Sequence, residues 1–341
     1  MTTSSPHPAA GGGRVVDVHA HAVPAALLAE LKPPDLTDDL RIRFGARLTP
    51  PVPEALTDVR SRIAEMDRTG VDVQVVSPWL ELSPDELDPA AATAFLNVLD
   101  EAMAAVVATR PDRLVALVLL DRHDPESAAV RLRRAAARPG FAGGELAVGG
   151  PGPRLDDARW DPLWKAASDT GALVLLHPWR AASPADLRTD RLGDIVDNPA
   201  QSTAAVAAMI LTGVFDRFPD LRLCVVHGGG FLPYQAGRLD AIARLRPDWS
   251  DDRVPPSTAL RRLYYDSLTH SATSLAWLVE FAGSDHVLLG SDHPFPTGDP
   301  EAVAAVATAP GLSHAQRGDV LGGAAAGLLG HRTLTVLNSM K

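Results

Sequence analysis

The sequence has little cysteine and lysine, and each shortage excludes one kind of structure. Cys224 is the single cysteine, so no disulfide forms within the chain, which fits a reducing cytoplasm. We expect Cys224 to be a small buried side chain and not a nucleophile, because it lies in an apolar run. The lysines are Lys32 in a proline-rich loop, Lys165 in a predicted helix and Lys341 at the last position. Since none follows a predicted strand, the sequence argues against a two-metal centre bridged by a carbamylated lysine.

Long hydrophobic runs and an excess of positive charge are also missing. No apolar stretch approaches the ~20 residues that a membrane helix needs, so we expect no membrane partner. The net charge of −10 argues against a nucleic-acid-binding protein. Residues 1–13 are rich in Ser, Pro, Ala and Gly and lack the apolar core of a secretory signal. We therefore predict a disordered lead over residues 1–13 and one cytoplasmic domain over residues 14–341.

Strand-like and helix-like segments alternate from end to end, a pattern typical of a parallel sheet built from βα units. The 341 residues suit a (β/α)₈ TIM barrel, typically about 250 residues, with additions. We predict an insertion after the first strand, up to about residue 53, and two extra C-terminal helices. The predicted strands are 14–18, 71–77, 114–120, 142–148, 172–176, 221–226, 262–266 and 287–289. The predicted helices are 53–69, 89–109, 125–137, 156–170, 199–215, 232–245, 272–281, 300–308 and 314–329.

Four short motifs stand where predicted strands end. They are VHAH at 18–21, LHPW at 176–179, VHGGG at 226–230 and GSDHP at 290–294. In a (β/α)₈ barrel these ends meet at one face, which carries the active site. We therefore expect the histidines and the aspartate to converge.

The HxH pair favours a metal site over ordinary core histidines. His19 and His21 are two residues apart on a strand, so both face the same side. Two buried imidazoles need partners. With His177 and Asp292 at matching positions, the set predicts one divalent metal ion, most simply zinc with an open position for water.

The order of the motifs resembles the amidohydrolase superfamily, in particular its decarboxylase branch typified by aminocarboxymuconate-semialdehyde decarboxylase. The matching stretches are VDVHAH at 16–21, RIAEMD at 62–67, LHPW at 176–179, GVFDRFP at 213–219, HGGG at 227–230, GR at 237–238, YDSL at 265–268 and GSDHPFP at 290–296. The resemblance implies a homodimer with one metal ion per chain, zinc first, with Mn²⁺, Fe²⁺ or Co²⁺ as alternatives. The implied metal ligands are His19, His21, His177 and Asp292.

The same resemblance implies roles for other residues. His227 acts with Asp292 in catalysis, as a general acid/base beside the metal-bound water and not as a ligand. Arg238 binds a substrate carboxylate, and so does an arginine of the insertion, Arg43 or Arg47, of which Arg43 is favoured.

The sequence departs from the family pattern in two places. His293 stands where the family usually has tyrosine, and as the neighbour of Asp292 it is expected to face away from the metal. The loop at 180–197 lacks the aromatic residues expected of the family's substrate pocket.

The predicted function is a metal-dependent decarboxylase acting on a small unsaturated or aromatic carboxylic acid. An anionic substrate suits the candidate arginines. Two alternatives stay open. One is a metal-dependent hydrolase or hydratase of a small amide, lactone or carbonyl compound, and the other is a metal-stabilised barrel that binds without catalysis.

Overall fold

Eight parallel strands form the centre of the molecule. The computed structural model describes residues 13–179, 191–250 and 252–329. The strands are β1 (Val16–Ala22), β4 (Val73–Pro78), β5 (Leu114–Leu119), β6 (Phe141–Ala147), β7 (Leu173–His177), β8 (Arg222–Val225), β9 (Tyr264–Asp266) and β10 (Val287–Leu288), paired in this order. The barrel closes between β10 and β1, where the Val18 amide donates to the Leu289 carbonyl at 2.8 Å. The predicted TIM barrel is confirmed.

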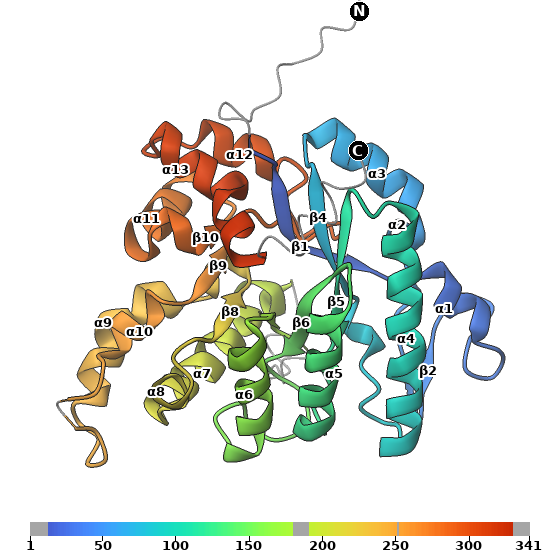
Figure 1. Cartoon of the computed structure of the whole chain (residues 1–341), viewed down its shortest axis with the longest axis horizontal. Helices are drawn as coiled ribbons and strands as arrows, with labels where there is room; N and C mark the ends of the chain where they lie inside the picture. The colour runs from blue at the N-terminus through green and yellow to red at the C-terminus, as the bar shows by residue number, and fades with distance from the viewer. Residues whose placement is uncertain (1–12, 180–190, 251, 330–341) are drawn as a thin grey trace, which may run out of the picture.

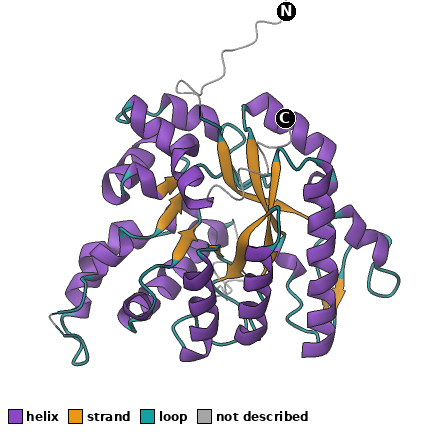
Figure 2. Ribbon diagram, viewed as in Figure 1, coloured by secondary structure: helices purple, strands orange, loops and turns teal. Residues whose placement is uncertain are grey.

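Helices surround the strands on the outside (Figures 1 and 2). The longer helices are α3 (Val59–Thr69), α4 (Pro89–Thr109), α5 (Pro125–Ala137), α6 (Asp161–Thr170), α7 (Asn198–Leu211), α9 (Leu232–Ala243) and α11 (Ala272–Ala282). Local sequence sets several of their ends. The side chains of Asp58, Asp88 and Asp124 accept hydrogen bonds from the first turns of α3, α4 and α5. Gly70 and Gly171 end α3 and α6 in the left-handed conformation.

The core has two layers because alternate strand residues point to opposite faces. One layer packs between the strands and the surrounding helices and includes Val76, Trp160 and Trp164. The other is formed by inward-facing side chains such as Val16, Leu117 and Cys224. Cys224 is fully buried, and this burial raises the pKa of its thiol, which agrees with the expected packing role.

The predicted insertion after the first strand is ordered. It contains α1 (Ala25–Glu30), the two-stranded hairpin of β2 (Arg43–Phe44) and β3 (Arg47–Leu48), and α2 (Glu54–Thr57). A second polar stretch, which leads into β9, contains α10 (Pro256–Leu260). These short elements lack the periodicity from which helices and strands are predicted.

Several predicted boundaries are wrong, for local reasons. The first strand does not end at residue 18 but continues to Ala22, so His19 and His21 lie within β1. The helix predicted at 53–69 is interrupted where Asp58 caps α3. The helix predicted at 199–215 is interrupted at Gly213. This glycine has a left-handed φ of 79° and precedes the short helix α8 (Val214–Arg217).

Two other predicted helices are also divided. The segment predicted at 156–170 begins as the 3₁₀ turn η2 (Ala158–Trp160) before α6. The segment predicted at 314–329 contains α13 (His314–Gly318) followed by the π-helical turn η7 (Asp319–Gly323). The extra C-terminal helix α12 (Ala302–Thr308) matches its prediction closely.

The statement that no apolar stretch reaches membrane length is also wrong. Helix α4 has 21 residues, and an 18-residue window within it has a mean hydropathy of 1.5, so by length and composition it could cross a membrane. In the structure Leu96, Leu99 and Met103 of α4 are buried in the core. The packing of a core helix accounts for this composition, which is therefore weak evidence for a membrane span.

Candidate metal centre and its cavity

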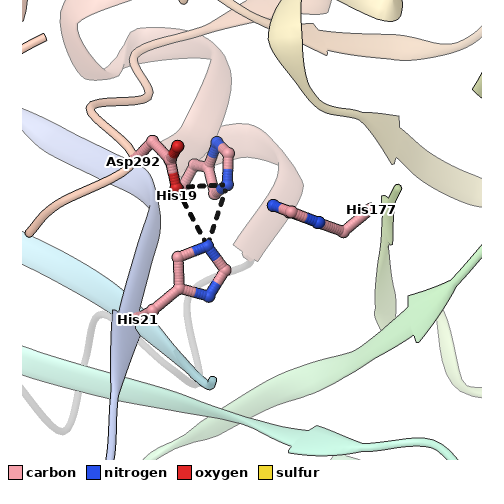
Figure 3. Close-up of side chains that lie close together, drawn as sticks. All are labelled: His19, His21, His177 and Asp292. Atoms are coloured by element: carbon pink, nitrogen blue, oxygen red, sulfur yellow. Dashed lines mark hydrogen bonds and ion pairs between the residues drawn. The ribbon is translucent and has the colours of Figure 1, made fainter. Parts of the chain in front are cut away.

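Strand β1 places two histidines inside the barrel at its carboxyl-terminal end. His19 and His21 are fully buried, and His21 lies in register with Ser77 on β4. His177 is the last residue of β7, and Asp292 follows β10 with a φ of 56°. Figure 3 shows the four side chains pointing toward one another from these three segments.

We call His19, His21, His177 and Asp292 the His/Asp cluster. The distances between their polar atoms are short enough for all four to bind one ion. His19 Nε2 lies 3.2 Å from His21 Nε2 and 3.4 Å from Asp292 Oδ1. His21 Nε2 lies 3.1 Å from the same oxygen. The ligand atoms of all four residues, with His177, lie within 4.8 Å of one another. The structure therefore brings together all four predicted ligands.

The far nitrogen of each cluster histidine has a hydrogen-bond partner of its own. His19 Nδ1 donates to Asp266 Oδ2 at 2.7 Å, and His177 Nδ1 donates to the Pro178 carbonyl at 2.6 Å. His21 Nδ1 lies 3.0 Å from the Ser77 hydroxyl. Such partners fix the ring orientation and leave Nε2 as the ligand atom.

The inner atoms of the cluster fit a cation. His177 Nε2 and Asp292 Oδ1 are buried, and neither has a hydrogen-bond partner within the described ranges. Buried polar atoms without partners are rare, and a metal ion would satisfy both. Three imidazoles and one carboxylate form a set that suits zinc or another divalent transition metal.

The charge states of Asp292 and His177 also suit metal binding. Burial alone would raise the pKa of Asp292, but the charge of His19 and the interactions with His21 and His227 outweigh it and hold that pKa well below its usual value. Burial lowers the pKa of His177. An ionised carboxylate and a neutral imidazole are the forms that bind metal.

His227 lies beside the cluster. Its ring centroid is 5.1 Å from that of His177, and its Nε2 is 3.8 Å from Asp292 Oδ2. Its side chain is 22% exposed and lines the cavity above the cluster. The glycines after it let the chain pass close to β9, because a Cβ on Gly229 would lie 2.5 Å from the Tyr265 ring.

A cavity of about 970 Å³ opens over the cluster. Its aromatic lining comes from Trp79, Trp179, Tyr234, Trp277 and Phe295. The absence of aromatic residues from the loop at 180–197 therefore does not leave the cavity without aromatic walls. Residues 180–190 of that loop lie outside the described residues.

The candidate substrate-binding arginines occupy different places. The Arg47 guanidinium is buried 6.0 Å from the ring of Trp179, which lines the cavity, and pairs with Glu81 and Asp85 at 3.4 and 3.1 Å. Arg43 is half-exposed and donates to the Pro34 carbonyl. Arg238 is exposed on α9, one helical turn beyond Tyr234, and is not part of the cavity lining. Arg47 is likewise absent from the cavity lining, but its guanidinium faces Trp179, which lines the cavity.

His293 faces away from the cluster, as expected. Its side chain lines a second cavity of about 400 Å³, together with Arg62 and Met66. Its backbone carbonyl accepts a hydrogen bond from the His21 amide at 2.8 Å. Burial lowers the pKa of the His293 imidazole to about 4.

Sequence reasoning did not assign several supporting residues. Asp266 accepts from His19 Nδ1 and, through its other oxygen, from the Gly228 amide at 2.7 Å, so it connects the cluster to the His227 loop. Asp17 accepts from the His19 amide and the Ser291 hydroxyl, which joins β1 to the segment bearing Asp292. In the sequence, these two residues could have been recognised as carboxylates within, or at the end of, otherwise apolar predicted strands.

Comparison with known proteins identifies the relatives of this chain. A family model described as amidohydrolase matches residues 16–331. The 2-amino-3-carboxymuconate-6-semialdehyde decarboxylase of Dictyostelium discoideum is 31% identical over 271 residues, which cover 79% of this chain and 76% of that protein.

Solved structures share the fold. The 5-carboxyvanillate decarboxylase of Sphingomonas paucimobilis is 26% identical with a TM-score of 0.78, covering 93% of this chain and 98% of that one. A dihydroxybenzoic acid decarboxylase from a Polaromonas species, solved with bound manganese, is 20% identical with a TM-score of 0.74, covering 93% and 97%.

Proposed function

The chain belongs to the amidohydrolase family, and we propose that it is a metal-dependent decarboxylase that removes CO₂ from a small unsaturated or aromatic carboxylic acid. The observation that carries the proposal is the His/Asp cluster at the base of an aromatic-lined cavity. A divalent ion and a planar acid are the two partners that this arrangement suits.

We propose His19, His21, His177 and Asp292 as the ligands of one divalent ion. Zinc is our first choice, and Mn²⁺, Fe²⁺ and Co²⁺ are alternatives that the same donor set accepts. When bound, such an ion supplies a positive charge that stabilises developing negative charge on the substrate and lowers the pKa of a bound water. Asp266 and Ser77 keep the rings of His19 and His21 in the ligating orientation.

His227 is the proposed proton donor and acceptor. Its Nε2 faces Asp292, which we place beside it in the catalytic pair, and both residues line the cavity. When the bond between the substrate carbon and its carboxylate breaks, the electron pair stays on that carbon and CO₂ leaves. His227 Nε2 then delivers a proton to the same carbon, so the product carries hydrogen in place of the carboxylate.

Arginine side chains orient the acid. Arg47 is our preferred residue because its guanidinium faces Trp179, which lines the cavity. Like Arg47, Arg43 and Arg238 are not part of the cavity lining, so each of the three would have to reach the substrate from outside it. The rings of Trp79 and Phe295, with centroids 6.4 Å apart, offer flat apolar walls for a conjugated substrate.

We further propose that the protein is a cytoplasmic homodimer. The exposed surface around α9 carries large apolar side chains: Tyr234 is 80% exposed, Ile242 47%, Leu245 78% and the neighbouring Trp277 42%. The rings of Tyr234 and Trp277 are in contact, with centroids 6.4 Å apart, and exposed apolar side chains that gather on one surface are a feature of protein interfaces. Analytical ultracentrifugation should find a dimer, and Leu245→Glu should shift it toward the monomer; a monomeric wild-type protein would contradict the proposal.

The activity is tested by CO₂ release. Purified protein loaded with Zn²⁺ or Mn²⁺ would be incubated with hydroxybenzoic acids, carboxyvanillic acids and conjugated amino-carboxylated enoic acids, with CO₂ and products measured by mass spectrometry. We expect metal-dependent release of CO₂ from at least one acid and no release after chelation. Products that gain water without losing CO₂ would identify a hydrolase or hydratase, and binding without turnover would indicate a non-catalytic protein.

A further inference from the structure

A third carboxylate lies inside the barrel behind the His/Asp cluster. Glu145 is on β6, in register with Leu119 of β5 and Leu175 of β7, and its side chain is 0% exposed. Its Oε1 lies 3.8 Å from His21 Nδ1, on the side of the ring away from the cluster. Neither Glu145 oxygen has a hydrogen-bond donor in suitable geometry within the part of the chain that the structure describes.

We propose that Glu145 is a positioning residue for His21: its carboxyl group behind Nδ1 keeps Nε2 directed at the metal position and strengthens divalent-metal binding. This inference rests on the proposed ligand set. Glu145 itself is not a ligand here, because the His21 ring stands between it and the other cluster residues.

The three cluster histidines differ in what supports them. His19 has a carboxylate partner, Asp266, at 2.7 Å, and His177 has a backbone carbonyl at 2.6 Å. His21 has only the neutral Ser77 hydroxyl at 3.0 Å, which can also donate to the Ala20 carbonyl at 3.3 Å. Glu145 places a carboxyl group behind Nδ1, where His21 otherwise has only that hydroxyl. A carboxylate behind a ligating imidazole raises its basicity and fixes its orientation.

The position of Glu145 is difficult to explain by packing alone. Its inward-facing neighbours on the adjacent strands, such as Leu117 and Leu175, are apolar. Burying a carboxylate without hydrogen bonds is costly, and an apolar side chain would avoid that cost. A metal ion in the His/Asp cluster, together with the His21 imidazole between that ion and Glu145, would offset this cost.

The direct test is metal affinity, which needs no substrate. Glu145→Gln keeps the shape and removes the charge, and its affinity for Zn²⁺ and Mn²⁺ would be measured by competition with a chromogenic chelator. We expect a loss of about 10- to 100-fold, the usual range for outer partners of ligands. Glu145→Asp keeps the charge and should recover part of the loss.

Asp100→Asn is the matched control. Asp100 is another largely buried carboxylate, on α4, where it pairs with Arg131 away from the cluster. We expect this variant to bind metal like the wild type. Affinities of Glu145→Gln within twofold of the wild type, or an equal loss in Asp100→Asn, would overturn the inference.

His21→Ala separates this inference from the proposed ligand set. If the wild type binds metal, His21→Ala loses it and Glu145→Gln does not, only the role of Glu145 fails. If His21→Ala keeps wild-type affinity, the ligand set fails and the inference fails with it.

Discussion

At the scale of single residues, the side chains proposed to hold the metal are distinct from the one proposed to move a proton. His227 is outside the His/Asp cluster but lines the same cavity. We expect His227→Ala to keep the metal and to lower turnover by about 10²- to 10⁴-fold, the usual contribution of a general acid/base. Elemental analysis and single-turnover CO₂ release on the same preparation check both parts. Loss of the metal from this variant would mean that His227 is a ligand.

Arg47 and Arg43 form a natural pair of variants because they lie on the same hairpin. Arg47→Lys keeps the charge but loses the planar fork, so we expect at least a tenfold lower kcat/KM on a turnover substrate. Arg43→Lys should stay within about twofold of the wild type. Equal values for Arg47→Lys and the wild type would remove Arg47 from the substrate site.

The contacts explain which residues could be predicted from sequence. The HxH, LHP and SDH motifs allow His19, His21, His177 and Asp292 to be predicted as a group. Each motif lies at the end of an apolar strand, and the barrel brings these strand ends together. Glu145 and Ser77 carry no such signal, since their relation to His21 depends on the register between neighbouring strands. The two hairpin arginines are equivalent in sequence and differ only in which way the hairpin directs them.

At the scale of elements, the seam between β10 and β1 holds the cluster together. Gly290 lies at this seam, where a Cβ would stand 2.8 Å from Asp266 Cβ and 3.1 Å from His19 Cβ. We expect Gly290→Ala to push these residues apart, weakening metal binding and costing about 1–3 kcal/mol of unfolding free energy, as overpacking does. Chelator competition and chemical denaturation measure the two effects.

Gly318→Ala is the control for that variant. Gly318 ends α13, and nothing lies within 4 Å of its ideal Cβ position. Alanine there should leave metal affinity unchanged and slightly raise stability through helix propensity. Wild-type metal affinity in Gly290→Ala would show that the seam tolerates a methyl group and would contradict this reading of the packing.

Helix and strand order followed from the hydrophobic pattern, but several boundaries did not. Asp58 caps α3 inside a segment whose apolar periodicity runs through it, and Gly213 interrupts a similar segment between α7 and α8. A capping residue or a left-handed residue occupies a single position and leaves the spacing of the apolar residues nearly unchanged. The apolar periodicity alone therefore does not reveal it. β1 is longer than predicted because its polar HxH end is buried against other polar groups instead of apolar ones.

At the scale of the whole molecule, metal binding at the proposed site would be linked to folding. The cluster joins β1, β7 and the segment after β10, so a bound ion connects the first, fifth and last strands of the barrel. A ligand at 100 times its Kd stabilises the folded state by about 2.7 kcal/mol. We expect chelated protein to melt at a lower temperature, and added Zn²⁺ or Mn²⁺ to restore the Tm in a concentration-dependent way. A His19→Ala, His21→Ala double variant should show no such shift.

The domain organisation is only partly described. The barrel accounts for the described ranges from residue 13 to residue 329, and the family match extends over residues 16–331. The predicted lead over residues 1–13 and the single domain over residues 14–341 stay predictions, because residues 1–12, Lys341 and the rest of the last segment lie outside the described residues.

The most direct test of the central claim is the metal content of protein purified without chelators. Inductively coupled plasma mass spectrometry should find about one equivalent of a divalent transition metal per chain in the wild type. The His19→Ala, His21→Ala double variant, folded by circular dichroism, should contain almost none. Well under half an equivalent in the wild-type protein, even after incubation with Zn²⁺ or Mn²⁺, or full occupancy in the double variant, would contradict the account.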